Sequence, residues 1–413
     1  MIRDAAPPRE RDTLLTIFGI ALAIRFVVFA ALCRSAYLDQ LELDMKSYHE
    51  LALRIADGQL RPTQVFYQSP LYAYFLGGLY RLFGSGLWVP RIANALLGAS
   101  SAGLAYVLGR HYFSRRAGWI AALALASCGP LLLEEYSVLK TALVVFLLLL
   151  SLVLLVLHQR TGRRRFIVAA GISFGLLCTA AGQFLIALPL LVLCVALQRA
   201  PGRLNLLSAT LLFVGSLLPL TPVVAWNSSA GGGLLLTSAD AGFNLYLGNN
   251  PHARGLPARP LGVRDHPQFE EQDARRFAEK AVGHSLNAAE VSRYFAREAV
   301  SFARRDPRAF LRGLRCKWSV LWNAYEVPDD RHYSFVRSEL SPLLWLLPTF
   351  AVVGPLSILG LLYGLRGGRA RLPLYAVTLS YLFVLVLFYV RGRYRLAALP
   401  LLCVYAGAGL DRL

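Results

Sequence analysis

Cysteine and histidine are scarce in this chain, and neither occurs in a pattern that forms a disulfide or metal site. Only six cysteines occur among 413 residues, and five of them lie in or beside long apolar runs, where a free thiol behaves as a small hydrophobic group. The seven histidines show no metal-ligand spacing. The sequence therefore predicts no disulfide framework, no zinc site and no resident cofactor; scattered carboxylates are the only support for a divalent metal.

Internal repeats and a signal-peptide cleavage site are also missing. The charged N-terminus, MIRDAAPPRERDT, leads directly into an apolar run of membrane-spanning length. We therefore expect a retained cytoplasmic tail and first helix. The lack of a repeat argues against a secondary transporter, because transporters tend to be built from paired repeats with broken helices at the membrane midplane.

Long apolar runs are what the chain has instead. Hydrophobic residues make up 56% of the sequence and fall in long blocks, which is typical of an all-α polytopic membrane protein. The run from Pro70 to Phe83 is too short to cross a membrane core of about 30 Å at about 1.5 Å per residue, so we expect an interfacial or re-entrant helix there. About ten spans are predicted, at residues 14–33, 88–110, 117–133, 137–157, 166–182, 184–198, 206–226, 343–365, 372–390 and 396–411.

Positive charge predicts the orientation of these spans. The net charge of +19 is spread over loops between apolar blocks, which argues against a nucleic-acid partner and favours anionic lipid headgroups or phosphate-bearing ligands. The positive-inside rule places arginine-rich loops in the cytoplasm. We therefore predict a bacterial inner (plasma) membrane protein with both termini cytoplasmic. The four arginine-rich loops on that side are residues 110–118, 158–165, 198–203 and 366–371.

This topology divides the chain into three parts. Residues 1–226 form an N-terminal transmembrane module with a first outer loop at 34–87. Residues 227–340 form a small periplasmic insertion with interfacial helices, and residues 341–413 form the C-terminal transmembrane helices. Within the insertion, the Asn287–Glu290 capping-box variant opens one helix. Asp306–Pro307 begins the next helix, whose arginines and aromatic residues suit a membrane interface.

One carboxylate stands at the start of a helix in the first outer loop. Asp44 lies one turn before Tyr48, on the face that continues through Leu51, Ala52 and Ile55. A carboxylate at a helix N-terminus stays ionised because the helix dipole favours the anion. We interpret Asp44 as a catalytic base; an ordinary N-cap is the alternative.

Basic residues on the outer face are candidates for a phosphate clamp. Arg391, Arg393 and Arg395 lie in the loop between the last two spans, where three guanidinium groups need an anionic partner, and a lipid phosphate is the natural one. Lys140 lies just inside the end of a span, where an ionisable group is costly without a partner. Lys317 completes the set. There are simpler alternatives. The loop arginines and Lys140 could snorkel to the headgroups, Lys140 could pair with a nearby glutamate, and Lys317 could be no more than part of a basic helix face.

Further polar residues on the outer face are candidates for a sugar or acceptor pocket. Glu134 and Glu135 could hold an acceptor or, together with Asp44, a metal, although a solvated turn explains them equally well. Asn249 and Asn250 precede a proline, and ordinary turn chemistry is the favoured explanation for them. The predicted pocket residues are Tyr48, Gln68, Glu134, Glu135, Tyr136, Asn249, Asn250 and Tyr394.

Four segments spread over nearly the whole chain carry a family resemblance. They are D-x-x-x-Y-x-x-x-A from Asp44 to Ala52; SPLYAYFLGGLYRLFG followed by PRIANALLG (90–98); GFNLYLGNNPHARG (242–255); and RYFAREAVSFARRDPRAFLRGLRCKWSVLWNAYEVPDD with the terminal RYRLAALPLL. In their order and sidedness they resemble the GT-C superfamily of membrane glycosyltransferases. Within it, they are similar to the dolichyl-phosphate-mannose-protein mannosyltransferase-like group (glycosyltransferase family 39-like), which includes bacterial aminoarabinose transferases.

The resemblance implies a GT-C-like helical bundle and an enzyme that passes a sugar from a polyprenyl-phosphate carrier to an acceptor on the outer face, with Asp44 as the base. Two departures bear on the details. Relatives often have a basic residue in the fifth span where this chain has TAAGQF (179–184), so a donor contact is missing or has moved to Gln183. Protein-mannosylating members often carry Asp-Glu in the first loop, whereas Met45 follows Asp44, which argues against a protein acceptor.

One base and a basic cluster suffice for this chemistry. A hydroxyl acceptor is a weak nucleophile near neutral pH and needs a base, whereas a lipid-phosphate leaving group needs positive charge rather than an acid. A single displacement inverts the anomeric centre without a second carboxylate nucleophile. We therefore predict an inverting hexosyl- or pentosyltransferase whose partners are a polyprenyl-phosphate sugar, a hydroxyl acceptor (protein, lipid or envelope glycan) and membrane lipids. The alternatives are a lipid-linked sugar flippase or transporter and a scaffold without turnover.

Overall fold

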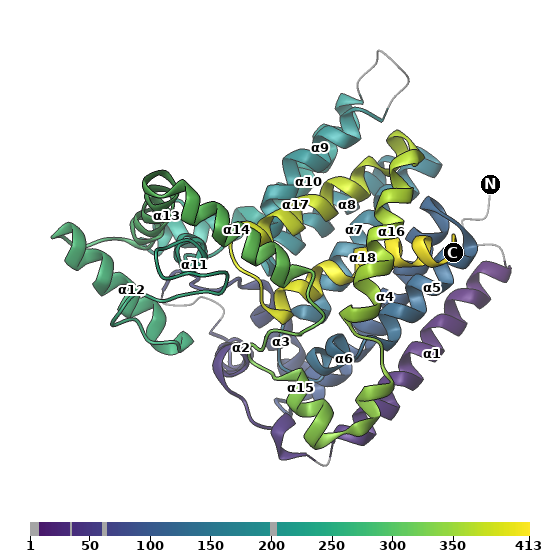
Figure 1. Ribbon diagram of the computed structural model, residues 1–413, viewed down its shortest axis with the longest axis horizontal. Coiled ribbons are helices and arrows are strands. Elements are labelled where there is room, and N and C mark those ends of the chain that lie inside the picture. The colour runs from purple at the N-terminus through teal and green to yellow at the C-terminus, as the bar shows by residue number, and fades with distance from the viewer. Residues whose placement is uncertain (1–7, 34, 60–63, 199–204) are drawn as a thin grey trace.

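A computed structural model of the protein describes residues 8–33, 35–59, 64–198 and 205–413, and these residues form helices and connecting loops without a strand. The bundle, on the right of Figure 1, consists of apolar helices of different lengths. These are α1 (Pro8–Leu32), α4 (Trp88–Tyr112), α5 (Arg115–Ser127), α7 (Thr141–Thr161), α8 (Arg164–Ala180), α9 (Ala187–Ala196), α10 (Leu206–Ser229), α16 (Phe350–Gly364), α17 (Leu372–Leu387) and α18 (Gly392–Leu410).

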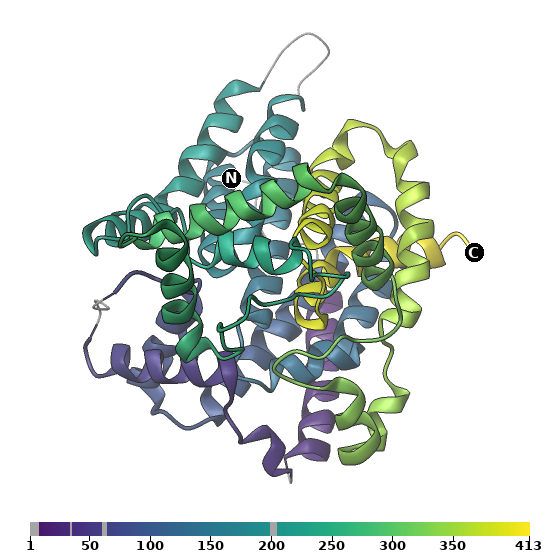
Figure 2. The ribbon, with the colours of Figure 1, turned by 60° about the vertical axis from the view of Figure 1, so that its left-hand side comes forward.

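A second group of helices gathers at one end of this bundle, at the left and bottom of Figure 1. The rotated view in Figure 2 shows α2 and α12 on the same side of the molecule, and the two helices are in contact. The group consists of α2 (Leu43–Ala56), α3 (Leu71–Phe83), α6 (Gly129–Glu135), α11 (Ala241–Gly248), α12 (Pro267–Val282), α13 (Ala288–Arg305), α14 (Pro307–Leu321) and α15 (Tyr333–Phe335). Short helical turns occur in the connections of both groups, at η1 (Ala36–Leu38), η2 (Gly182–Ile186), η3 (Val336–Leu340), η4 (Pro342–Leu346), η5 (Leu365–Gly367) and η6 (Arg369–Arg371).

The structure supports a multi-pass membrane protein, with fewer candidate spans than the ten predicted. Among the described residues, six helices are long and apolar enough to cross a membrane, and the pair α5–α6, bent by 54°, would add a seventh. The predicted spans at 166–182, 184–198 and 396–411 do form helices, but α8 and α9 are short and α18 begins with two arginines in its first turn. The six helices lie at Glu10–Leu32, Trp88–Tyr112, Thr141–Thr161, Leu206–Ser229, Pro342–Gly367 and Arg369–Leu387.

Other local predictions can be compared directly with the helices. Helix α3 has 13 residues, which agrees with the expectation that this segment is too short to cross. Asn287 caps α13 with Glu290 in a complete capping box, and the Asp306 carboxylate accepts a hydrogen bond from the Ala309 amide at the start of α14. Of the arginine-rich loop at 198–203, all but Gln198 lies outside the described residues.

Small residues allow the bundle helices to approach closely. A Cβ on Gly171 of α8 would lie 2.4 Å from the Leu212 carbonyl oxygen of α10, and one on Gly360 of α16 would lie 1.8 Å from the Tyr405 carbonyl oxygen of α18. Both distances are shorter than atoms tolerate. Close backbone contact through glycine is typical of helices packed in membranes, where van der Waals contact drives association.

A buried ion pair crosses the bundle. The Arg25 guanidinium of α1 donates to the Glu135 carboxylate of α6 over 2.7 Å, and the side chains are only 2% and 1% exposed. Gly98 of α4 leaves room for it, since a Cβ there would lie 2.1 Å from Glu135 Oε1. The pair thus ties α1 and α4 to the short helix that leads into α7.

Candidate active site

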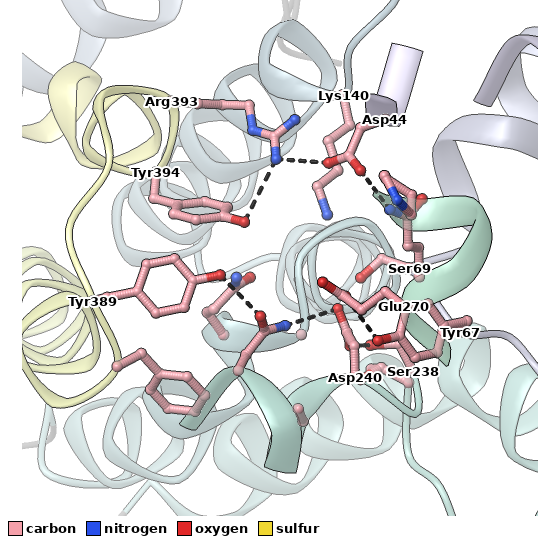
Figure 3. Close-up of a pocket in the computed structure, with 18 of the residues that line it drawn as sticks. Asp44, Tyr67, Ser69, Lys140, Ser238, Asp240, Glu270, Tyr389, Arg393 and Tyr394 are labelled. Carbon is pink, nitrogen blue, oxygen red and sulfur yellow. Dashed lines mark hydrogen bonds and ion pairs between the residues drawn. The ribbon is translucent and has the colours of Figure 1, made fainter. Parts of the chain in front are cut away.

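A cavity of about 410 Å³ opens where α2, α11, α12 and the loop before α18 meet (Figure 3). Its walls come from segments far apart in the sequence: residues 43–48 and 67–69, Lys140, residues 182–186 and 234–244, and the loops at 329–330 and 388–394. Ile186, Leu234 and Leu236 line it with exposed apolar side chains. The cavity therefore has charged walls and an apolar border.

Asp44 faces this cavity from the first turn of α2. Its carboxylate accepts hydrogen bonds from Gln68 Nε2 and from Arg393 Nη2, each over 2.6 Å. Burial alone would raise the pKa of Asp44, but the adjacent Arg393 charge and hydrogen bond outweigh it, so the pKa lies below its usual value. The preceding residue, Leu43, has φ +48°, a left-handed conformation that a bulky side chain rarely adopts. Asp44 is thus held ionised in a fixed direction.

Arg393 is the centre of an acidic cluster. In addition to Asp44, its Nη1 donates to Asp330 over 2.6 Å, and its Nε lies 3.0 Å from Asp329, in an alignment that pairs the charges without a hydrogen bond. Arg391 pairs with Asp329 as well. The partners of these guanidinium groups are therefore carboxylates of this chain. This corrects the expectation that a lipid phosphate is the natural partner of all three loop arginines.

Lys140 lines the same cavity immediately before α7. In the part of the chain that the structure describes, its ammonium group makes no hydrogen bond or ion pair. Burial and the nearby Arg393 charge lower its pKa to about 8, against the opposing effect of Asp240 and Asp44. Figure 3 shows the ammonium directed into the space between the Asp44–Arg393 pair and Asp240. Lys140 is thus a cation that is available to an anionic ligand.

The wall opposite Asp44 consists of hydrogen-bonded polar side chains. Asp240 accepts from Ser238 Oγ over 2.6 Å and from Asn244 Nδ2 over 3.0 Å. The Asn244 amide oxygen in turn accepts from the Tyr389 hydroxyl over 2.8 Å. Nearby, the Tyr67 hydroxyl donates to Glu270 over 2.7 Å. This wall joins the insertion to the loop before α18.

Half of the fourteen predicted site residues line this cavity. Beside the predicted base and Lys140 lie two loop arginines and three pocket candidates, and Gln183 also reaches the cavity. The seven are Asp44, Tyr48, Gln68, Lys140, Arg391, Arg393 and Tyr394.

Two of the other predicted residues are cations in closed environments. Arg395 pairs with Glu326 and donates to backbone carbonyls, among them that of Leu321. The Lys317 ammonium donates to Asn249 Oδ1 over 2.9 Å and to three backbone carbonyls; burial lowers its pKa to about 8. Both cations already have partners, so we leave them out of the proposed site.

The remaining predicted residues also lie behind the cavity wall. Glu135 pairs with Arg25, Glu134 is buried beside Thr141, and the Tyr136 hydroxyl donates to the Arg25 carbonyl. Asn250 Oδ1 accepts from the His252 amide, a local contact that agrees with the favoured turn explanation. Asn249 instead donates to the Leu387 carbonyl far along the chain and accepts from Lys317, so turn chemistry does not explain it. No three side chains among the described residues are arranged to hold a metal ion.

Sequence reasoning missed most of the polar wall and the acids around Arg393. A signal for the acids was available, because Asp329 and Asp330 end one of the segments that carry the family resemblance. Asn244 likewise lies in another of these segments, residues 242–255. Nothing marked the rest, since single polar residues in a loop-rich region have no distinctive spacing. The missed cavity residues include Tyr67, Ser238, Asp240, Asn244, Arg259, Glu270, Asp329, Asp330 and Tyr389.

A second cavity, of about 320 Å³, shares a wall with the first. Tyr48 and residues 67–69 line both cavities, so Gln68 stands between them. Beyond that wall the second cavity is lined largely by charged and amide side chains from α2, the segment before α3 and the start of α12. A polar ligand in it would lie next to Asp44.

Comparison with known proteins bears on the predicted family. Residues 67–226, less than half of the chain, match the family model of dolichyl-phosphate-mannose-protein mannosyltransferases. The predicted family resemblance is confirmed. No curated protein sequence matches the chain.

Solved structures support the predicted fold. The chain is similar to the oligosaccharyltransferase of Archaeoglobus fulgidus in complex with zinc and sulfate, with a TM-score of 0.56 and 16% identity over 96% of this chain and 49% of that chain. The oligosaccharyltransferase AglB of the same organism, in complex with an inhibitory peptide and a dolichol-phosphate, has a TM-score of 0.53 and 16% identity over 98% of this chain and 51% of that chain. The chain therefore shares the fold of these oligosaccharyltransferases, and it spans about half of their length. ArnT from Cupriavidus metallidurans bound to undecaprenyl phosphate matches more loosely, with a TM-score of 0.43 and 20% identity over 96% of this chain and 77% of that chain.

Proposed function

We propose that the protein is an inverting glycosyltransferase that moves a sugar from a polyprenyl-phosphate carrier to a hydroxyl acceptor on the outer face of the plasma membrane. One observation carries the proposal: the ionised Asp44 carboxylate faces the same cavity as the Lys140 ammonium, which has no partner among the described residues. A base for the incoming hydroxyl and a cation for the departing phosphate are the two groups that this transfer requires.

The donor is held at Lys140. Its ammonium has no partner within the described ranges, so a phosphate there would gain a charge-assisted contact without breaking an existing one. The Arg391 side chain, 24% exposed, and Gln183 lie on the same cavity. Ile186, Leu234 and Leu236 give the carrier lipid an apolar exit toward the membrane. The similar AglB fold has been solved with a dolichol-phosphate, which supports a carrier of this type.

Asp44 acts on the acceptor. Gln68 and Arg393 fix its carboxylate, and the lowered pKa keeps it ionised at neutral pH. A carboxylate of low pKa is a weak base, so the hydroxyl proton passes to it only as the new glycosidic bond forms. The bond between the anomeric carbon and the phosphate breaks in the same step, and the phosphate leaves as an anion beside Lys140.

The acceptor approaches through the second cavity. That cavity meets the first at Gln68 and Tyr48, beside Asp44. Its amide and charged lining, which includes Gln64 and Glu271, suits the hydroxyl groups of an envelope glycan better than an apolar lipid. The Asp44–Met45 sequence also argues against a protein acceptor.

The test is consumption of a donor. Purified protein is incubated with envelope extract and with polyprenyl-phosphate mannose, glucose, arabinose or aminoarabinose, and release of polyprenyl phosphate is measured. We expect wild type to consume one donor and Asp44→Asn to lose roughly 100- to 10,000-fold in rate, the usual contribution of a positioned base. The matched control is Asp39→Asn, because Asp39 is an exposed carboxylate of the same loop that pairs with Arg91.

Two results would contradict the proposal. Equal rates for wild type and Asp44→Asn would remove Asp44 as the base. Movement of a lipid-linked sugar across reconstituted vesicles, with no release of polyprenyl phosphate from any donor, would favour the flippase alternative.

A further inference from the structure

The charges that line the active-site cavity are nearly all paired with one another. Arg393 pairs with three acids, Arg391 with Asp329, and Arg259 with Asp265 and Glu270. Two charged side chains of this lining have no ion pair among the described residues: Lys140 and Asp240. The charged lining residues are Asp44, Lys140, Asp240, Arg259, Asp265, Glu270, Asp329, Asp330, Arg391 and Arg393.

Asp240 occupies the N-cap position of α11, yet its side chain does not cap the helix. Aspartate is favoured at this position because its carboxylate accepts hydrogen bonds from the first free amides of a helix. Here the carboxylate accepts instead from the Ser238 hydroxyl and the Asn244 side-chain amide. The contacts that would explain Asp240 as a helix cap are therefore absent from α11.

The two donors fix the direction of Asp240 without neutralising it. Ser238 and Asn244 each donate one hydrogen bond, to different carboxylate oxygens, and each oxygen can accept another. Asn244 is itself held by the Tyr389 hydroxyl over 2.8 Å. A charge that is fixed in direction and lacks a cation is arranged to receive hydrogen-bond donors from a ligand.

Lys140 and Asp240 face the same space from opposite sides (Figure 3). Their charges influence one another, but they form no ion pair, so the gap between them is open to a ligand. A molecule that satisfies both needs an anion at one end and hydroxyl donors at the other. A sugar attached to a phosphate has this arrangement.

We propose that Asp240, oriented by Ser238 and Asn244, recognises the donor sugar by accepting hydrogen bonds from its ring hydroxyls, while Lys140 holds the phosphate. The inference rests on the proposed function. It adds that the sugar lies against the insertion, on the wall opposite Asp44. Asp240 and Asn244 then determine which sugar the enzyme accepts.

Binding of two ligands by the full-length protein in detergent tests this assignment. The probes are polyprenyl phosphate alone and the polyprenyl-phosphate sugar that wild type consumes. Asp240→Asn should weaken binding of the sugar-bearing donor roughly 10- to 100-fold, because hydrogen bonds to a charged group are lost, and should leave binding of polyprenyl phosphate unchanged. Lys140→Gln should weaken both. Asp39→Asn is the matched control, since Asp39 is an exposed carboxylate outside the cavity lining that pairs with Arg91.

A pH series on wild type gives a readout that a structural role would not produce. Burial raises the pKa of Asp240 to about 6, with Glu270 and Asp44 acting in the same direction and the Ser238 hydrogen bond and Lys140 opposing it. The Michaelis constant for the donor should rise as pH falls below about 6, where the carboxyl is protonated, and Asp240→Asn should be flat over that range. If Asp240→Asn does not fold, deoxy-sugar donors replace it: one of them should bind wild type roughly tenfold more weakly.

The outcomes separate this inference from the proposed function. Two results would overturn the assignment of Asp240 and leave the proposed function intact. One is an equal loss of affinity for both ligands in Asp240→Asn, and the other is equal binding of all deoxy donors by wild type. Absence of donor consumption by wild type would overturn the proposed function itself.

Discussion

Two acid–arginine pairs in this protein have the same geometry and different surroundings. Asp44–Arg393 has an N–O distance of 2.6 Å and Arg25–Glu135 one of 2.7 Å. The Asp44 side chain is 17% exposed and borders a cavity, whereas that of Glu135 is 1% exposed. Arg393 also has two further carboxylates within reach, while Glu135 Oε2 and Arg25 Nε have no hydrogen-bond partner in the part of the chain that the structure describes. The open pair, with two further acids around its arginine, is therefore available for the reaction that we propose, whereas the sealed pair joins two helices.

The largest effect on stability is expected at the sealed pair. Glu135→Gln leaves the Arg25 charge buried without a counterion, which should lower the free energy of unfolding by about 3–5 kcal/mol. Unfolding by a titration with sodium dodecyl sulfate measures it, and the rate per folded molecule should be unchanged.

Its control is the double variant Arg25→Met with Glu135→Leu, which removes both charges and should recover most of the stability. If Glu135→Gln instead kept its stability and lost activity, the contrast between the two pairs would fail.

A pH-dependent effect is expected at the open site. Because the pKa of Lys140 is lowered to about 8, its ammonium loses its proton as pH rises through that value, and donor turnover should fall. Lys140→Arg should remove this decline because a guanidinium stays charged. A decline that is identical in wild type and Lys140→Arg would assign it to another group.

The smallest effect is expected at the second contact of Asp44. Gln68→Ala removes one of the two hydrogen bonds that orient the carboxylate and should reduce the rate roughly tenfold, with unchanged stability. Gln159→Ala is the control, since its amide donates to Gln198, away from the cavity. Equal rates for Gln68→Ala and wild type would show that Arg393 alone is sufficient to orient Asp44.

Local patterns in the sequence predicted the local structure well. The apolar blocks form helices, the residues with apolar i, i+3, i+4 spacing after Asp44 form α2, and Asn287 caps its helix as predicted. The same reasoning failed for Glu134 and Glu135, which are adjacent in the sequence. Successive residues on a helix point in directions about 100° apart, so one carboxylate of α6 meets Arg25 and the other lies beside Thr141.

Sequence alone determined that this chain is a helical multi-pass membrane protein. It also predicted that polar residues gather in the outer loops and that Asp44 and Lys140 are chemically suited to transfer. Hydrophobicity and helix periodicity depend on residues that are close together in the sequence, so the sequence is enough to recognise them. Only the tertiary structure decided which charges remain available. Arg393 meets Asp44 across 349 positions of the chain, and the acids of the 326–330 segment pair with the loop arginines. Because a charge is neutralised by whatever lies near it in space, only the fold shows that two charges of the cavity, Lys140 and Asp240, have no ion pair among the described residues.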